Sequence, residues 1–107
     1  MKYQINIGLN VPNQQVDTQA QLDKALALLV DSFKVHRAAL AQSSTEPTLL
    51  AEFSADPRRV YETLIQISDK LGQDCVAVYN PQRQQGALVG SKAAEWGTFS
   101  IAKFLAL

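Results

Sequence analysis

The sequence predicts an α+β domain in which an antiparallel sheet carries two helices on one of its faces. Three observations support this prediction. The first residues alternate apolar and polar side chains, which is the period of a strand with one buried face. Two later segments repeat apolar residues every three or four positions, as amphipathic helices do. Short apolar runs bounded by polar turns follow each of these segments, and such runs are typical of strands.

One domain is expected over residues 1–107, because domains usually hold roughly 100–150 residues and 47% of this chain is hydrophobic. The 10 basic residues are balanced by 10 acidic ones, whereas nucleic-acid binding relies on an excess of basic residues. We therefore expect no nucleic-acid partner. No stretch approaches the roughly 20 apolar residues that span a bilayer, so we expect no membrane segment.

The N-terminal segment predicts a strand and a helix. Apolar and polar residues alternate from Lys2 to Leu9, where the first strand is expected. Thr18, with Gln21 three positions later, fits the capping box that starts many helices. Apolar residues at helical spacing then continue the predicted helix to about Phe33.

The middle of the chain predicts a hairpin and a second helix. The runs Val35–Gln42 and Pro47–Ser54 are separated by a short polar turn, as the two strands of a hairpin are. Asp56 is a favourable N-cap, and Pro57 is tolerated at the first helical position because its missing N–H is not needed there. Gly72 is placed to end this helix in the left-handed conformation.

The last third predicts a second hairpin and an added tail. A strand at about Asp74–Tyr79 is followed by a polar loop and by the short apolar run Ala87–Val89. In the tail, Ser91–Leu107, a short helical turn is expected, followed by a packed end that is either extended or helical.

The order strand, helix, strand, strand, helix, strand is that of the ferredoxin-like βαββαβ architecture. Right-handed crossovers put both helices on one face of the sheet. The opposite face is expected to be mostly polar, and it is either wet, covered by a partner such as a second copy, or covered by the tail. Homodimerisation through sheet faces or edge strands therefore stays open. Residues assigned to that face are Lys2, Gln4, Asn6, Thr48, Leu50 and Glu52. This architecture hosts many unrelated functions.

Cys75 is the only cysteine and His36 the only histidine. An intramolecular disulfide is impossible, and a reducing, cytoplasmic setting is the expectation. Cys75 lies in an apolar run, where a thiol behaves as a small hydrophobe; a reactive thiolate is the alternative, and it requires a nearby cation or helix N-terminus. His36 is interpreted as structural, so we expect no metal site within one chain.

Motifs for catalysis are missing from the sequence. The carboxylates do not recur at a spacing that places two of them on one face near a pocket. The five glycines form neither a Walker loop nor a dinucleotide-binding loop, so no cofactor is expected. The sequence names no catalytic residue and favours a protein that is not an enzyme.

Arg58 and Arg59 lie in the first turn of the predicted second helix, where the positive end of the helix dipole disfavours cations. Conflicts of this kind sometimes mark an anion site, because backbone N–H groups and guanidinium groups converge there. The alternative is that both arginines are simply solvated.

Trp96, Phe99 and Arg83 are the remaining candidates for a binding surface. Trp and Arg are enriched among residues that dominate binding energy. The competing interpretation is that the aromatic residues of the tail seal the core.

The leading hypothesis is a small protein-binding or regulatory module, with homodimerisation left open. Its candidate binding residues are Trp96, Phe99 and Arg83, with Arg58 and Arg59 as a second patch. The rival hypothesis is a small-molecule binder or cofactor-independent enzyme. That protein has a pocket between helices and sheet, in which His36, Tyr61 or Tyr79 supplies the polar groups.

Overall fold

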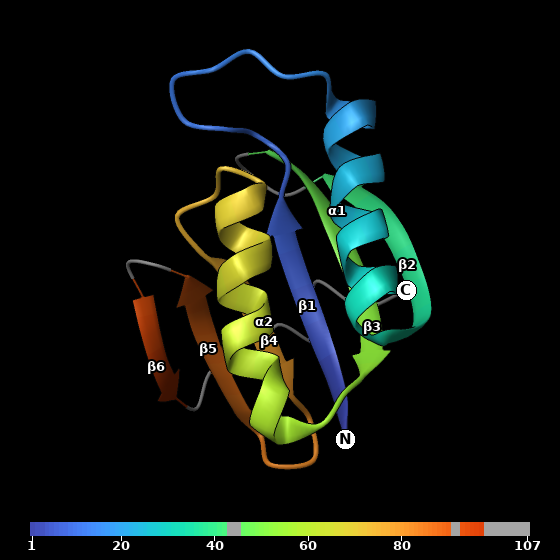
Figure 1. The fold of residues 1–107 in the computed structure, drawn as a ribbon, viewed down its shortest axis with the longest axis vertical. Helices are drawn as coiled ribbons and strands as arrows, with labels where there is room; N and C mark the ends of the chain where they lie inside the picture. The colour runs from blue at the N-terminus through green and yellow to red at the C-terminus, as the bar shows by residue number, and fades with distance from the viewer. Residues whose placement is uncertain (43–45, 91–92, 98–107) are drawn as a thin grey trace.

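The computed structural model describes residues 1–42, 46–90 and 93–97, the last of these by backbone alone, and it has an α+β architecture (Figure 1). The elements along the chain are β1 (Lys2–Gly8), α1 (Thr18–Ser32), β2 (Lys34–Gln42), β3 (Pro47–Ser54), α2 (Pro57–Lys70), β4 (Val76–Asn80), β5 (Gln85–Gly90) and β6 (Ala93–Gly97). The strands form one six-stranded sheet in the order β2-β3-β1-β4-β5-β6, and all neighbours are antiparallel. Both helices lie on the same face of this sheet (Figure 1). No helix among the described residues is both long and apolar enough to cross a membrane.

The core lies between this face and the helices, and β1 runs through its centre between β3 and β4. The alternation that predicts β1 is confirmed, since Tyr3, Ile5 and Ile7 are buried. Three aromatic rings stack in the core. The ring centroid of Phe53 is 5.5 Å from that of Tyr3 and 4.5 Å from that of Phe33.

The sheet face opposite the helices is less polar than the sequence suggests. The register pairs Gln4 with Glu52, so these side chains share that face as expected. Leu50 is only 2% exposed, however, and it forms a second small apolar cluster with Tyr79. Alternation along one strand assigns a residue to a face, but it does not determine how completely that face is covered.

The first helix starts one residue away from the predicted cap. Asp17 is the N-cap of α1, and its carboxylate accepts a hydrogen bond from the backbone N–H of Gln19. Gln21 does not complete a capping box. Its side chain is buried and donates a 2.8 Å hydrogen bond to the carbonyl oxygen of Leu71, which ties α1 to the end of α2.

The second helix begins and ends as the sequence predicts. Asp56 is its N-cap, and Pro57 occupies the first turn. Gly72 has a φ of +69° at the end of the helix. The N–H groups of Gly72 and Gln73 donate to the carbonyls of Asp69 and Ser68, which is the Schellman arrangement that satisfies the last turn.

The C-terminal part contains a strand where a helical turn is expected. The predicted hairpin forms from β4 and β5, and β5 pairs on its other side with β6. The prediction was wrong for residues 93–97, because pairing with the open edge of β5 outweighs the weak helical preference of Ala93, Ala94 and Glu95. The rest of the predicted tail lies outside the described residues.

Candidate functional site

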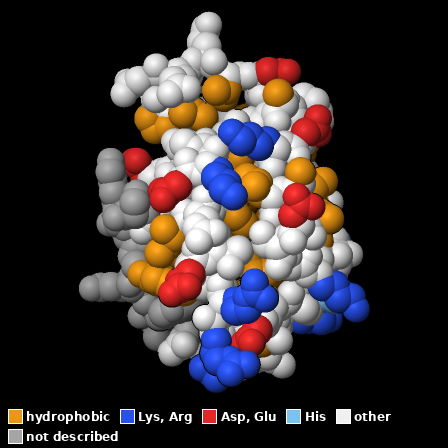
Figure 2. Space-filling view, in the orientation of Figure 1, with side chains coloured by type: hydrophobic (Ala, Val, Ile, Leu, Met, Phe, Trp, Pro, Cys, Tyr) orange, Lys and Arg blue, Asp and Glu red, His pale blue; other side chains and the backbone are white. Residues whose placement is uncertain are grey.

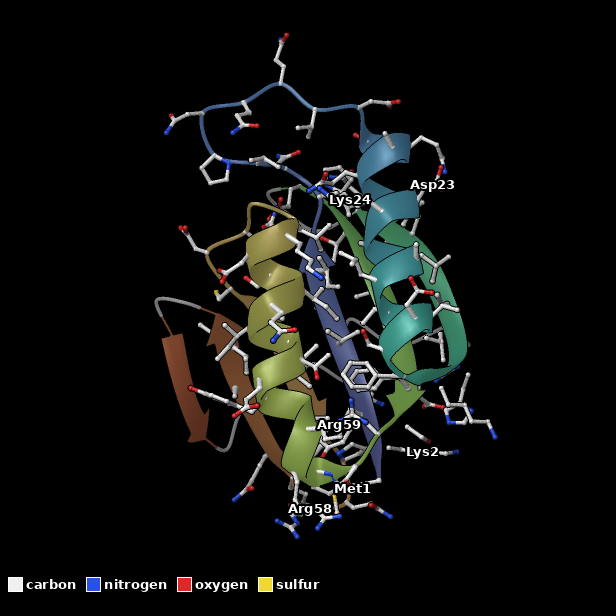
Figure 3. The ribbon with its side chains drawn as sticks, in the orientation of Figure 1. Met1, Lys2, Asp23, Lys24, Arg58 and Arg59 are labelled. Carbon is white, nitrogen blue, oxygen red and sulfur yellow. The ribbon has the colours of Figure 1, made fainter. Side chains whose placement is uncertain are left out.

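Four basic residues from three distant segments meet at one end of the sheet. β1 begins at this end with Lys2, α2 begins there with Arg58 and Arg59, and the turn between β4 and β5 places Arg83 there. We call this surface, formed by Lys2, Arg58, Arg59 and Arg83, the basic end. Figure 3 shows the labelled Lys2, Arg58 and Arg59 at the lower end of the molecule, Lys2 on β1 and the two arginines on α2. Blue side chains gather at the same end in the space-filling view (Figure 2).

Arg58 is neutralised by the residue that caps its own helix. Its Nη2 lies 3.0 Å from Oδ2 of Asp56, and its Nε donates to Oδ1 at 3.2 Å. Asp56 also accepts a hydrogen bond from the backbone N–H of Arg58. These contacts lower the pKa of Asp56 and raise the pKa of Arg58. The expected conflict with the helix dipole is therefore relieved by a local ion pair, which leaves Arg58 with little attraction for an external anion.

Arg59 and Arg83 are exposed, and neither side chain makes a hydrogen bond or ion pair with any residue that the structure describes. Arg59 lines an open cleft of about 270 Å³ between the last turn of α1 and the first turn of α2, which Lys34 and Asp56 also line. Arg83 lines a second open cleft of about 210 Å³ together with Pro57, the first residue of α2. Two guanidinium groups that form no ion pair thus lie on either side of the start of one helix.

The turn that carries Arg83 is held in place by Asn80. The side-chain oxygen of Asn80 accepts hydrogen bonds from the backbone N–H groups of Gln82 and Arg83, at 3.0 and 3.2 Å. Arg83 lies close enough to Tyr3 to affect its hydroxyl: burial raises the pKa of Tyr3, and the Arg83 charge partly opposes that rise. The position of Arg83 is therefore set by an Asx turn at the end of a central strand.

Trp96 belongs to the last described strand, and its backbone lies near the same end of the sheet. It is the register partner of Ala87, and Gly97 is the partner of Gly86, the residue after Gln85. Gln85 in turn lines the cleft that contains Arg83. Phe99, the other aromatic candidate, lies outside the described residues.

The three residues proposed for a pocket between helices and sheet do not meet. His36 is on the edge strand β2, at a bulge, where its Nε2 lies 2.6 Å from the Ser54 hydroxyl. Tyr61 is on α2, and Tyr79 belongs to the cluster on the opposite face of the sheet. The clefts described here open at the ends of the molecule rather than between its layers.

The end opposite the basic end contains the cysteine. Cys75 is half-buried and shares an open cleft with Glu46, Asn10 and Asp74. Burial, and to a lesser extent the charge of Asp74, raises the pKa of the Cys75 thiol. This environment favours the unreactive thiol over the thiolate. Within the described parts of the chain, no group of three or more His, Cys, Asp or Glu residues is arranged to hold a metal ion.

Sequence reasoning missed the roles of three residues at the basic end, Lys2, Asp56 and Asn80. Lys2 was assigned only to the wet face of a strand, and Asp56 only to a cap, although the structure makes it the ion-pair partner of Arg58. The sequence does contain a signal for the role of Asn80, because Asn followed by Pro often begins a turn. No local signal shows that the start of β1 lies beside the start of α2, since this is a property of the topology.

No protein-family model, curated protein or solved structure matches this chain. A function is therefore argued from the placement of its own side chains.

Proposed function

We propose that this chain is a small protein-binding module that recognises an acidic region of another protein through its basic end. The observation that carries this proposal is the placement of Arg59 and Arg83, which come from different segments, line separate clefts on either side of the start of α2, and make no hydrogen bond or ion pair with the described residues. Unpaired arginines at a surface are suited to carboxylates, because the planar guanidinium group forms bidentate hydrogen bonds with them.

A protein partner fits this surface better than a nucleic acid does. Asp56 lies among the arginines, and its carboxylate repels a continuous phosphate chain. The chain as a whole has no net charge, so it lacks the long-range attraction that brings nucleic acids to basic proteins. A protein surface with scattered acidic groups tolerates such a mixture of charges.

The proposal includes three further parts. Trp96 and Phe99 are proposed as aromatic anchors beside the basic end, which the register of β6 supports for the backbone position of Trp96. The strand order β2-β3-β1-β4, with α1 and α2 as crossovers, supports a ferredoxin-like core extended by β5 and β6. A reducing, cytoplasmic setting is proposed from the single cysteine.

A pull-down from the protein's own host tests the basic end. The tagged chain is crosslinked in cells, purified and analysed for associated proteins by mass spectrometry. The double variant Arg59→Glu with Arg83→Glu is expected to lose the associated protein at least about tenfold, because each substitution turns attraction into repulsion. The control is Lys24→Glu with Lys70→Glu, an equal change of charge at exposed positions away from the basic end.

Three outcomes decide the proposal. Equal loss in both double variants, or in neither, overturns a specific role for the basic end, provided that circular dichroism shows both to be folded. A small molecule retained without any protein overturns it in favour of a ligand-binding protein. Trp96→Ala separates the two roles of that residue: an anchor weakens binding at unchanged stability, whereas a core residue costs about 3–5 kcal/mol of unfolding free energy.

A further inference from the structure

The sheet face opposite the helices is buried near its centre, although no described element crosses it. Leu50 is 2% exposed and Tyr79 is 9% exposed, and the two belong to one small apolar cluster on that face. Both helices lie on the other face (Figure 1). The register neighbours of Leu50 are Asn6 and Ala39, whose side chains are no longer than its own. These neighbours cannot enclose Leu50, so another part of the molecule covers it.

The covering atoms belong to the chain itself. The exposures of Leu50 and Tyr79 are those of a single chain, so no partner produces them. The structure describes every residue except 43–45, 91–92 and 98–107, with 93–97 described by backbone alone. Residues 43–45 and 91–92 are short connections between paired strands, and three strands separate β6 from β3, which carries Leu50. Only the residues that follow β6 are numerous enough to cross the face.

The register shows where such a segment has room to pass. Gly86 pairs with Tyr79 on one side and with Gly97 on the other, so the row from the end of β6 to Tyr79 contains two residues without side chains. Leu88 shares this face through its partner Ala77, yet it is 48% exposed. The cover therefore follows the row of glycines toward Tyr79 and does not extend over Leu88.

Residues 100–107 have the composition and the length for this position. Their large apolar side chains are Ile101, Phe104, Leu105 and Leu107, and Lys103 carries their single charge. An apolar run of this kind is rarely left in water. The four steps from β6 to β3 amount to about 19 Å at about 4.8 Å per step, and a fully extended segment of this length spans about 26 Å.

A buried acceptor on the same face lacks a donor. Gln4 lies between its register partners Glu52 and Tyr79. Its Oε1 is buried and accepts no hydrogen bond from the described residues. A buried acceptor without a partner costs free energy, so this position favours a covering segment that brings N–H groups to the face.

We propose that residues 100–107 fold back across the sheet face opposite the helices and cover Leu50 and Tyr79. Their apolar side chains pack on this cluster, and one of their N–H groups donates to Oε1 of Gln4. The face is then closed to a second copy, which removes sheet-to-sheet contact as a route to a homodimer. Phe99 precedes the segment and none of the basic residues takes part, so failure of this inference is distinguishable from failure of the proposed function.

Nuclear Overhauser effects in the unmodified chain test the placement directly. Protons of Leu50 and Tyr79 are expected to show effects to residues 100–107, whereas Leu88 on the same face shows none. An equimolar mixture of isotope-labelled and unlabelled chains is expected to show no effect that crosses from one chain to the other. Effects that cross between chains overturn the proposal in favour of a second copy. The absence of any effect between the segment and the cluster also overturns it.

A double-mutant cycle measures the contact. Phe104→Ser with Leu105→Ser removes two apolar side chains from the segment. In this background, Leu50→Ala is expected to lower the urea midpoint at most about half as much as in the unmodified chain, since the contact is already lost. The matched control is Leu64→Ala, a buried residue on the helix side, with equal effects in both backgrounds. Equal effects of Leu50→Ala in the two backgrounds overturn the contact.

Discussion

Gly90 is required at its position because two backbone segments touch there. A β-carbon on Gly90 would lie 2.7 Å from the Cα of Cys75 and closer still to the carbonyl oxygen of Asp74. Neither atom belongs to a flexible side chain, so the end of β5 and the entry to β4 must separate to admit even a methyl group. This contact explains why the hairpin of β4 and β5 ends in glycine.

Gly90→Ala is expected to lower the unfolding free energy by about 1–3 kcal/mol, the usual cost of overpacking. Gly8→Ala serves as the comparison, because the added methyl group meets the side-chain carboxylate of Glu46, which is able to move aside. Urea denaturation followed by circular dichroism measures both. A Gly90→Ala variant as stable as the unmodified chain, or less affected than Gly8→Ala, contradicts the packing described here.

Helix α2 depends on one residue for both its cap and its charge balance. Asp56 accepts the backbone N–H of Arg58 and also pairs with the guanidinium group of the same residue. The pKa of Asp56 is lowered from its ordinary value of 3.8, first by the side-chain hydrogen bonds from Arg58 and then by the backbone hydrogen bond. A carboxyl group with a lowered pKa stabilises the fold above its unfolded-state pKa, and this contribution is lost as the pH falls through the folded-state value.

Asp56→Asn is expected to flatten the loss of stability in acid. Asparagine still caps the helix, but it cannot pair with Arg58 or titrate. Urea midpoints measured from about pH 6 to about pH 2.5 are expected to fall less for the variant than for the unmodified chain, and the difference arises below about pH 4. The effect is small because the pair is exposed. Parallel curves for the two proteins show that Asp56 contributes no such linkage. Arg58→Gln should reproduce part of the flattening, because the hydrogen bond from the backbone N–H of residue 58 to Asp56 remains.

The helices and strands that could be predicted are those whose conformation is determined by residues close to them in sequence. Alternation is enough to locate β1, and a cap with a terminal glycine locates α2 between Asp56 and Gly72. β6 was missed because its conformation is imposed by the free edge of β5 and is not a preference of its own residues. The side chain of Gln21 was misassigned for the same reason, since its partner Leu71 is 50 residues away in sequence.

The candidate site was only partly predictable. Arg58, Arg59 and Arg83 were identified by residue type and local context. Their convergence follows from the order β1-β4 in the sheet and from the antiparallel direction of the strands, which sends the end of β4 back to the start of β1. The pairing of Arg58 and the freedom of Arg59 depend on side-chain geometry, which no spacing rule specifies.

In the sheet as a whole, the central strands are paired on both sides, whereas each of the two outer described strands is paired on one side only. β1 lies between β3 and β4, so its backbone groups are bonded in both directions, whereas β2 and β6 are outermost among the described strands. Amide hydrogen exchange reports this difference, because buried central strands open only when most of the fold opens. β1 and β3 are therefore expected to exchange at least about tenfold more slowly than β6. Exchange in β1 as fast as in β6 contradicts this strand order, because a strand that is paired on both sides opens less readily than one that is paired on a single side.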